Sequence, residues 1–332
     1  MEALGPRIAA RNARVLAGVF VLCLSVLLSG CAGMFPQTAT LRSGLPGGMS
    51  EKVELKQVPF FPQEEFECGP ASLAMALDAA GAKVTPEELV PQVYLPARKG
   101  SLQVEMLAAA RRHGTVSYVL APRFLDLLRE IEAGNPVIVL YDQGVWSPLT
   151  SWHYAVAVGY DYDSGDLVLR SGTIERQVIS FPVHELMWKG SGYWAMVAVP
   201  PERIPATAQP DPWLSSVAAL ERTGDVRNAR TAYETFLKRW PENTNAEIGL
   251  ANTLHAQGEL PRAERVLRDA ARRAPDNPVV LNNLAQTLSD QNRDDEALPF
   301  IDRAARLGGP HAAAVEDTRR GILERLSSKK KN

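Results

Sequence analysis

Cys68 is the residue of this sequence whose chemistry is easiest to anticipate. The chain has three cysteines, and Cys23 and Cys31 both belong to an N-terminal segment with the pattern of an export signal. Cys68 is therefore left without a partner for an intramolecular disulfide. An unpaired thiol in an exported protein is a liability unless it is buried or used in a reaction. The sequence makes Cys68 a candidate nucleophile.

The residues after Cys68 place it at the N-terminus of a helix. Gly69-Pro70 follows the cysteine, and residues 71–80 have a helical pattern. Proline is tolerated in a first helical turn because its missing N–H would be unpaired there anyway. Free N–H groups and aligned peptide dipoles at this end favour a thiolate, so we expect a lowered pKa and alkylation faster than that of a free thiol. Glu65 and Glu67 oppose this effect by like charge.

A cysteine nucleophile needs a base, and three histidines lie between Cys68 and residue 200. His113 ends a helical segment, where a cation interacts favourably with the helix dipole. His184 is expected to open a short helix and to be structural. His153 begins a strand, and strand ends often place side chains at the rim of a site. Together with a cysteine at a helix N-terminus, His153 is the expected general base.

The order of these residues resembles a known family. The pattern Gln-x4-Cys-Gly-Pro-Ala, which starts at Gln63, is followed far downstream by HYAVAVGYD, which starts at His153. This resembles the papain-like cysteine peptidases that cleave double-glycine leaders from bacteriocins, over most of residues 53–200. The resemblance implies that Cys68 is the nucleophile and His153 the base. It also implies that Gln63 donates to the oxyanion, where an N–H group stabilises charge on a carbonyl oxygen.

One position departs from the family pattern. The family carries an Asp after the hairpin return to orient the histidine, and here Ser171 occupies that place. A neutral hydroxyl can accept a hydrogen bond from the ring N–H, but it does not stabilise an imidazolium as a carboxylate would. Asp161 is the alternative, whereas Asp163 is expected in a turn. The sequence therefore leaves either Ser171 or Asp161 as the orienting group. Because the two groups differ in charge, the level of activity is left open as well.

The elements expected around these residues form an α+β papain-like domain over residues 53–200, with N-terminal helices packed on an antiparallel sheet. Helices are expected over residues 71–80, 104–113 and 123–132. Strands are expected over residues 137–141, 154–160, 167–170 and 193–199. Asp163-Ser164-Gly165 is a turn signal that makes a hairpin of the second and third of these strands.

The chain beyond residue 210 repeats with a period of 34. Small, large apolar and turn positions recur at this spacing: Ala229, Ala263 and Ala297; Tyr233, Leu267 and Ile301; Gly224, Gly258 and Asn292. This resembles the tetratricopeptide repeat, in which pairs of antiparallel helices stack into a solenoid. We expect a stiff Pro-rich linker (201–211), three repeats (212–310), a capping helix (311–326) and a basic tail (327–332).

The N-terminus is typical of a bacterial lipoprotein signal over residues 1–31. Three arginines precede an apolar run at residues 15–28. That run is shorter than the roughly 20 residues of a membrane span. Leu28-Ser29-Gly30-Cys31 resembles a lipobox, which implies lipidation of Cys31 and, with Ala32 following, an outer-membrane protein that faces the periplasm. The alternative is an uncleaved anchor. Residues 32–52 are rich in Gly, Pro, Ser and Thr and are expected to form a flexible tether.

Composition narrows the function. A formal net charge of −2, with no basic stripe, argues against a nucleic-acid partner. Phosphate-binding loops and metal-type Cys/His spacings are absent from the sequence, so we expect no cofactor or metal. The sequence predicts an envelope-anchored cysteine peptidase that acts on proteins or peptides and whose repeats recruit a protein partner. The alternatives are a catalytically impaired scaffold lipoprotein and an enzyme that transfers the acyl group to another amine.

Overall fold

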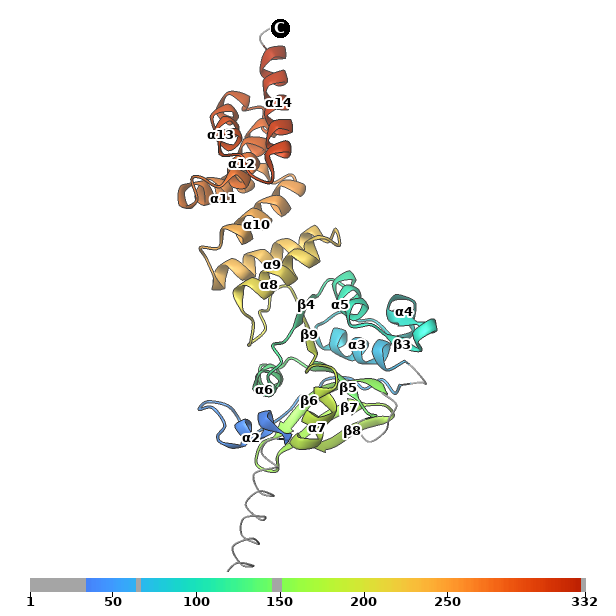
Figure 1. The fold of residues 1–332 in the computed structure, drawn as a ribbon. Helices are drawn as coiled ribbons and strands as arrows, with labels where there is room; N and C mark the ends of the chain where they lie inside the picture. The colour runs from blue at the N-terminus through green and yellow to red at the C-terminus, as the bar shows by residue number, and fades with distance from the viewer. Residues whose placement is uncertain (1–33, 64–66, 145–150, 330–332) are drawn as a thin grey trace, which may run out of the picture.

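The fold has two parts, an α+β domain and a stack of helices that rises from it (Figure 1). The structure is a computed structural model that describes residues 34–63, 67–144 and 151–329. The N-terminal part joins an antiparallel sheet to helices, and the C-terminal part contains only helices. Both halves of the predicted fold class are confirmed.

The sheet of the first domain is antiparallel throughout. Among the described residues it has seven strands, in the order β4-β9-β5-β6-β7-β8, with β1 paired to β6 beside that path. The strands are β1 (Lys52–Glu54), β4 (Val116–Val119), β5 (Val137–Asp142), β6 (Trp152–Asp161), β7 (Asp166–Ser171), β8 (Ile174–Ser180) and β9 (Ala195–Val199). The four expected strands are present. The sequence missed β1, β4 and β8, which are short or exposed and lack a continuous apolar run.

Helices pack around this sheet. They are α2 (Pro36–Arg42), α3 (Cys68–Ala79), α4 (Pro86–Val93), α5 (Gln103–Arg112), α6 (Phe124–Glu132) and α7 (Phe181–Lys189). A small hairpin between α4 and α5 consists of β2 (Tyr94–Leu95), the 3-10 turn η1 (Pro96–Arg98) and β3 (Gly100–Ser101). Helix α3 is almost wholly apolar and packs across β6, which fixes Cys68 against the sheet.

The expected flexible tether is wrong for the part of it that the structure describes. Helix α2 lies on the domain beside α6 and α7 (Figure 1). The buried carboxylate of Glu185 accepts hydrogen bonds from the backbone N–H groups of Gln37, at 3.0 Å, and Thr38, at 2.6 Å. The Gln37 side chain in turn accepts from the N–H of Phe124 at 2.6 Å. These long-range contacts hold a segment whose composition alone suggested a tether.

The Pro-rich segment before the repeats is anchored to the first domain. Glu130 is fully buried, and its carboxylate accepts hydrogen bonds from the Thr207 N–H at 2.7 Å and the Thr207 hydroxyl at 2.6 Å. Tyr118 on β4 meets Trp213 edge to face, with ring centroids 5.8 Å apart. The apolar core therefore continues from the sheet into the first repeat, and the stack has a fixed base.

The repeats follow the predicted register. Three helix pairs are present: α8 (Pro210–Glu221) with α9 (Val226–Arg239), α10 (Thr244–Ala256) with α11 (Leu260–Arg273), and α12 (Pro278–Asp290) with α13 (Asp294–Leu307). The registered Ala and large apolar positions are buried, at 2% exposure or less. Gly224, Gly258 and Asn292 have positive φ, at 86°, 75° and 62°. That backbone suits glycine or asparagine and explains why only these two types occupy the turn.

The capping helix α14 (Ala312–Lys329) is longer than predicted. Residues 327–329, expected in a solvated tail, continue it, and the Lys329 ammonium lies 2.7 Å from the buried carboxylate of Asp294. Among the described residues, none of the helices has the length and apolar character needed to cross a membrane. Cys31, the predicted signal segment and the lipobox-like motif lie outside the described residues.

Candidate active site

Cys68 is the first residue of α3, as the Gly69-Pro70 pattern predicted. It is a free cysteine that is only partly exposed. Gly69 is needed beside it, because a Cβ at that position would lie 2.2 Å from the Ser101 hydroxyl on β3. The hairpin thus packs directly on the turn of helix that carries Cys68.

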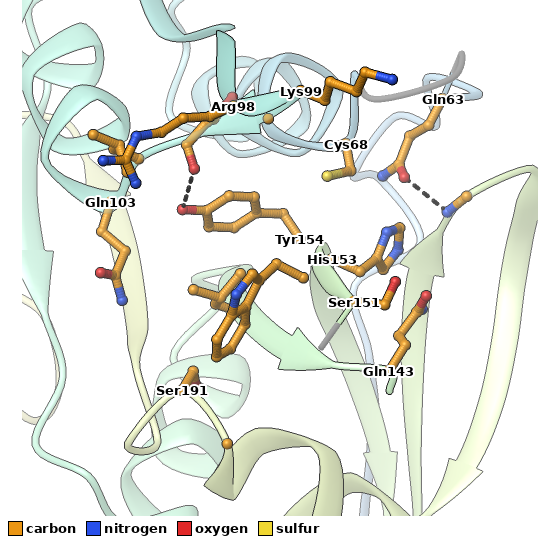
Figure 2. A pocket seen from close by; sticks show the side chains of 17 residues that line it. Gln63, Cys68, Arg98, Lys99, Gln103, Gln143, Ser151, His153, Tyr154 and Ser191 are labelled. Atoms are coloured by element: carbon orange, nitrogen blue, oxygen red, sulfur yellow. Dashed lines mark hydrogen bonds between the residues drawn. The ribbon is translucent and has the colours of Figure 1, made fainter. Parts of the chain in front are cut away.

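His153 is held by Ser171. The ring Nε2 lies 3.0 Å from the hydroxyl oxygen of Ser171, at the end of the neighbouring strand β7. With Nε2 protonated and donating to Ser171, the second ring nitrogen, Nδ1, is the one left to accept a proton. Figure 2 shows the His153 ring facing the Cys68 sulfur across the cleft. Of the two orienting candidates, the structure therefore brings Ser171 to His153.

Asp161 is not part of this site, so that alternative is wrong. It ends β6 eight residues after His153, which corresponds to about 26 Å along an extended strand. Its carboxylate lies 2.7 Å from the Lys52 ammonium on the far side of the domain. An extended strand with His153 near its start cannot return its last residue to the His153 ring.

Gln63 is oriented by the turn between β7 and β8. Its side-chain oxygen accepts a hydrogen bond from the Gly172 N–H at 3.1 Å, and its backbone N–H donates to the Gly172 oxygen at 3.1 Å. These bonds fix the carbonyl end of the amide, so the NH₂ group faces α3, where it lies 3.4 Å from the Ser72 hydroxyl. Figure 2 shows Gln63 beside Cys68. This orientation suits a donor to an oxyanion that forms next to the sulfur.

The three residues line one cleft with a volume of about 790 Å³. Its described lining also includes Trp152, Tyr154, Gln143 and several residues of the β2–β3 hairpin and the start of α5. The Tyr154 hydroxyl donates to the Ser101 backbone oxygen at 3.2 Å and ties the hairpin to β6. A cleft of this size accommodates a short segment of peptide.

The protonation states differ from the sequence-based expectation. Burial raises the pKa of the Cys68 thiol, although the backbone N–H groups of Tyr154, Gly69 and Cys68 itself act in the opposite direction. The expected lowering of this pKa is therefore wrong, because desolvation outweighs the helix N-terminus. Burial also lowers the pKa of His153 to about 4. At neutral pH the pair rests as an uncharged thiol and an uncharged imidazole.

The other two histidines have structural positions. His113 follows α5 and its ring lies 3.0 Å from the Gln92 side chain. His184 is fully buried in α7, where Nδ1 lies 2.6 Å from the Tyr141 hydroxyl, and burial lowers its pKa to about 3. Neither ring lines the cleft that contains Cys68. Among the described residues, no group of three or more His, Cys, Asp or Glu side chains could hold a metal ion.

The sequence missed the hairpin wall of the cleft. Arg98 and Ser101 lie in a segment with strands of two residues, which are too short to show a period. Trp152 and Tyr154 flank His153 directly, but strict alternation along β6 would have put them on the opposite face, so only the structure shows that they line the cleft. Gly100 was the local sequence signal for a turn here. In the structure the preceding residue, Lys99, has a positive φ of 48°.

Family models agree with this architecture. Residues 55–178 match the Peptidase_C39-like family, and residues 217–278 and 249–312 match the tetratricopeptide repeat. The first domain is therefore Peptidase_C39-like, and tetratricopeptide repeats follow it. No curated protein matches the chain.

Solved structures resemble each part. A C39-like peptidase from Bacillus anthracis is 18% identical, with a TM-score of 0.38, over 45% of this chain and 98% of its own. The type III secretion translocator chaperone SycD of Yersinia enterocolitica is 17% identical, with a TM-score of 0.34, over 37% of this chain and 95% of its own. The TPR2B domain of yeast Sti1 is 19% identical, with a TM-score of 0.32, over 33% of this chain and 91% of its own.

Proposed function

Because this chain joins a Peptidase_C39-like domain to tetratricopeptide repeats, we propose that it is a cysteine peptidase whose repeats recruit a protein or peptide partner. The observation that supports the catalytic part most strongly is the convergence of Cys68, His153 and Gln63 on one cleft. A nucleophile, a base oriented by a third group, and an oxyanion donor are the parts that acyl transfer requires.

The reaction follows from this geometry. His153 Nδ1 takes the thiol proton as the Cys68 sulfur attacks the peptide carbonyl, and a C–S bond forms. The negative oxygen is stabilised by the Gln63 NH₂ group and the Cys68 backbone N–H. The C–N bond then breaks, and His153 returns the proton to the departing amine. Water, deprotonated by His153, attacks the thioester, which releases a carboxylic acid and restores the thiol.

Because Cys68 and His153 are both uncharged at rest, we infer that His153 acts as a general base during the attack. A preformed thiolate–imidazolium pair would need a raised pKa at His153 and a lowered one at Cys68, and burial acts against both. Proton transfer therefore accompanies C–S bond formation. General-base assistance of this kind contributes about 10²–10⁴-fold to a rate.

The test is cleavage of a synthetic peptide library by the purified mature protein, read by mass spectrometry. Wild type is expected to cleave, Cys68→Ala to be inactive, and Gln63→Ala to lose about 10²–10³-fold in kcat, the cost of one oxyanion donor. Circular dichroism checks that each variant is folded. Cleavage that persists in Cys68→Ala would overturn the proposal.

One observation favours a different function. The histidine is held by a neutral hydroxyl rather than a carboxylate, which suits a peptidase fold that has become a binding module. In that case wild type would cleave no peptide of the library, while peptides would still bind the repeats.

The third possibility is an enzyme that transfers the acyl group to an amine instead of to water. Adding an amine acceptor to the cleavage assay tests it, because acyl transfer to that amine would appear as a new ligated product.

The repeats offer a surface for such a partner. A hollow of about 280 Å³ between α10 and α12 is lined by amide side chains, including Asn252, Asn282 and Asn283. Asn283 donates to Asn252 at 2.9 Å, and the buried side-chain oxygen of Asn282 has no partner among the described residues. Amide groups both donate and accept, which matches the N–H and C=O groups of a peptide backbone.

We further propose that the protein is held at the outer membrane, facing the periplasm, by lipid on Cys31. The motif Leu28-Ser29-Gly30-Cys31 supports this. Cys31→Ser should move the protein to the soluble periplasmic fraction. If that variant stays with membranes after an alkaline carbonate wash, the anchor is an uncleaved N-terminal segment instead.

A further inference from the structure

We propose that Arg98 forms a subsite of the cleft that binds a carboxylate of the peptide substrate. The enzyme would then prefer peptides with a carboxylate, such as an Asp or Glu side chain, a small number of residues from the scissile bond. This inference rests on the proposed peptidase function and adds a substrate class to it.

Arg98 lies in the β2–β3 hairpin, the wall of the cleft that packs on helix α3. It ends η1, and the adjoining strand β3 packs on Gly69 through Ser101, next to Cys68. The bond from the Tyr154 hydroxyl to the Ser101 backbone oxygen, 3.2 Å long, holds the same wall to the strand that carries His153. The place of Arg98 relative to the nucleophile is therefore set by packing.

Among the described residues, Arg98 has no anionic partner. Its side chain is exposed, and it makes no ion pair or hydrogen bond with the residues that the structure describes. The described lining of the cleft contains Arg98 and Lys99 but no Asp or Glu. Glu105, in the first turn of α5, does not line the cleft. A guanidinium group presents a planar fork of donors that fits a carboxylate in a bidentate manner.

The surroundings of Arg98 add to its preference for an anion. Gln103 lines the same end of the cleft and is the first residue of α5, a helix whose start has no side-chain cap. Figure 2 shows Arg98 and Gln103 on one side of the Tyr154 ring, with Cys68, His153 and Gln63 on the other. Because Arg98 and Cys68 line the same cleft, an extended peptide bound along it can contact both.

The experiment profiles cleavage of two hexapeptide libraries, both N-terminally acetylated. One is C-terminally amidated and the other ends in a free carboxylate. In the amidated library, wild type is expected to enrich Asp and Glu at one fixed position from the cleaved bond. Replacing that acid by its amide should lower kcat/KM about 10–100-fold, the usual range for a charged hydrogen bond. Enrichment confined to the second library would instead identify a chain-terminal carboxylate as the ligand.

Arg98→Glu should reverse the preference toward Lys and Arg at the same position. Arg306→Glu is the matched control, since it changes the net charge equally but lies on α13, outside the cleft. The control should keep the acidic preference. Wild-type cleavage with no acidic preference, or a preference unchanged in Arg98→Glu, would overturn the subsite while leaving the peptidase function intact.

Binding gives a readout that does not depend on turnover. The Cys68→Ala variant is incubated with the same libraries, and bound peptides are identified by affinity selection and mass spectrometry. Acidic peptides should be retained, and Arg98→Glu in the same background should lose them. Equal retention of acidic and neutral peptides would contradict the subsite, and absence of cleavage by wild type beside acidic retention would contradict only the peptidase function.

Discussion

His153 Nε2 and the Ser171 hydroxyl oxygen lie 3.0 Å apart, so a neutral group orients the imidazole that we propose as the catalytic base. Ser171→Ala should lower kcat/KM only about 2–10-fold, the value of one neutral hydrogen bond. His153→Ala removes the base and should cost about 10²–10⁴-fold. Asp161→Asn is the control and should be silent, because Asp161 pairs with Lys52. If the Ser171 variants kept the wild-type kcat/KM while Asp161→Asn were inactive, this arrangement would be refuted.

Ser171→Asp should maintain or raise turnover and should also move the pH profile. A carboxylate beside the ring favours its charged form, so the pKa of His153 should rise from about 4 toward neutrality. The acidic limb of kcat/KM should shift upward with it. A merely structural serine would not produce this shift, and an unchanged limb in an active Ser171→Asp variant would argue against direct contact with the ring.

The neutral pair predicts a distinctive pH dependence of the wild-type enzyme. The base is lost only when His153 protonates, so kcat/KM should fall to half near pH 4, well below the value of about 6.5 for an ordinary imidazole. Because the Cys68 pKa is raised, iodoacetamide should alkylate it more slowly than free cysteine at neutral pH and faster as the pH becomes alkaline. Alkylation faster than that of free cysteine at pH 7 would show a preformed thiolate.

Gly69 is predicted to be intolerant of even one methyl group. A Cβ would lie 2.2 Å from the Ser101 hydroxyl and 2.6 Å from its Cβ, so Gly69→Ala should displace the hairpin and depress both activity and the free energy of unfolding, the latter by about 1–3 kcal/mol. The double variant Gly69→Ala with Ser101→Gly should recover most of the loss. Gly321→Ala on α14, where a Cβ meets no atom within 4 Å, should be neutral or slightly stabilising.

Glu130 is predicted to fix the repeats to the Peptidase_C39-like domain. Glu130→Ala leaves the buried Thr207 N–H and hydroxyl without their acceptor, which should cost about 1–3 kcal/mol for each unsatisfied group. Limited proteolysis should then cut within residues 200–210. Glu202→Ala, at an exposed neighbouring position, is the matched control and should leave the segment resistant. Equal resistance of Glu130→Ala would show that other contacts, such as Tyr118–Trp213 and the Arg203–Asn135 hydrogen bond, are sufficient to hold the junction.

Local patterns predicted the site where it depends on neighbours in sequence. Gly69-Pro70 placed Cys68 at a helix start, and the apolar run after His153 placed that residue at a strand start. The length of the strand already separates Asp161 from His153, by about 26 Å, whereas the place of Ser171 beside the ring depends on the pairing of β6 with β7. The period of 34 was sufficient for the repeats, since each helix pair contacts mainly its neighbours.

Tertiary packing decided what the sequence could not predict. The pKa of Cys68 depends more on burial than on the start of α3, and an argument from neighbouring residues takes account of the helix alone. Helix α2 exists because Glu185, almost 150 positions away in the chain, accepts its N–H groups. Arg98 lines the cleft because its hairpin packs on Gly69, a contact between segments that no local pattern predicts.

The most direct test of the central claim is to trap the acyl group on Cys68. A peptide p-nitrophenyl ester is mixed with the mature protein, quenched at short times, and analysed by intact and tandem mass spectrometry. We predict a transient adduct of the acyl mass on Cys68, which decays as product forms and accumulates far more slowly in His153→Ala. An adduct that never forms, or one that forms at the same rate without His153, would contradict the assignment of this cleft as a cysteine peptidase site.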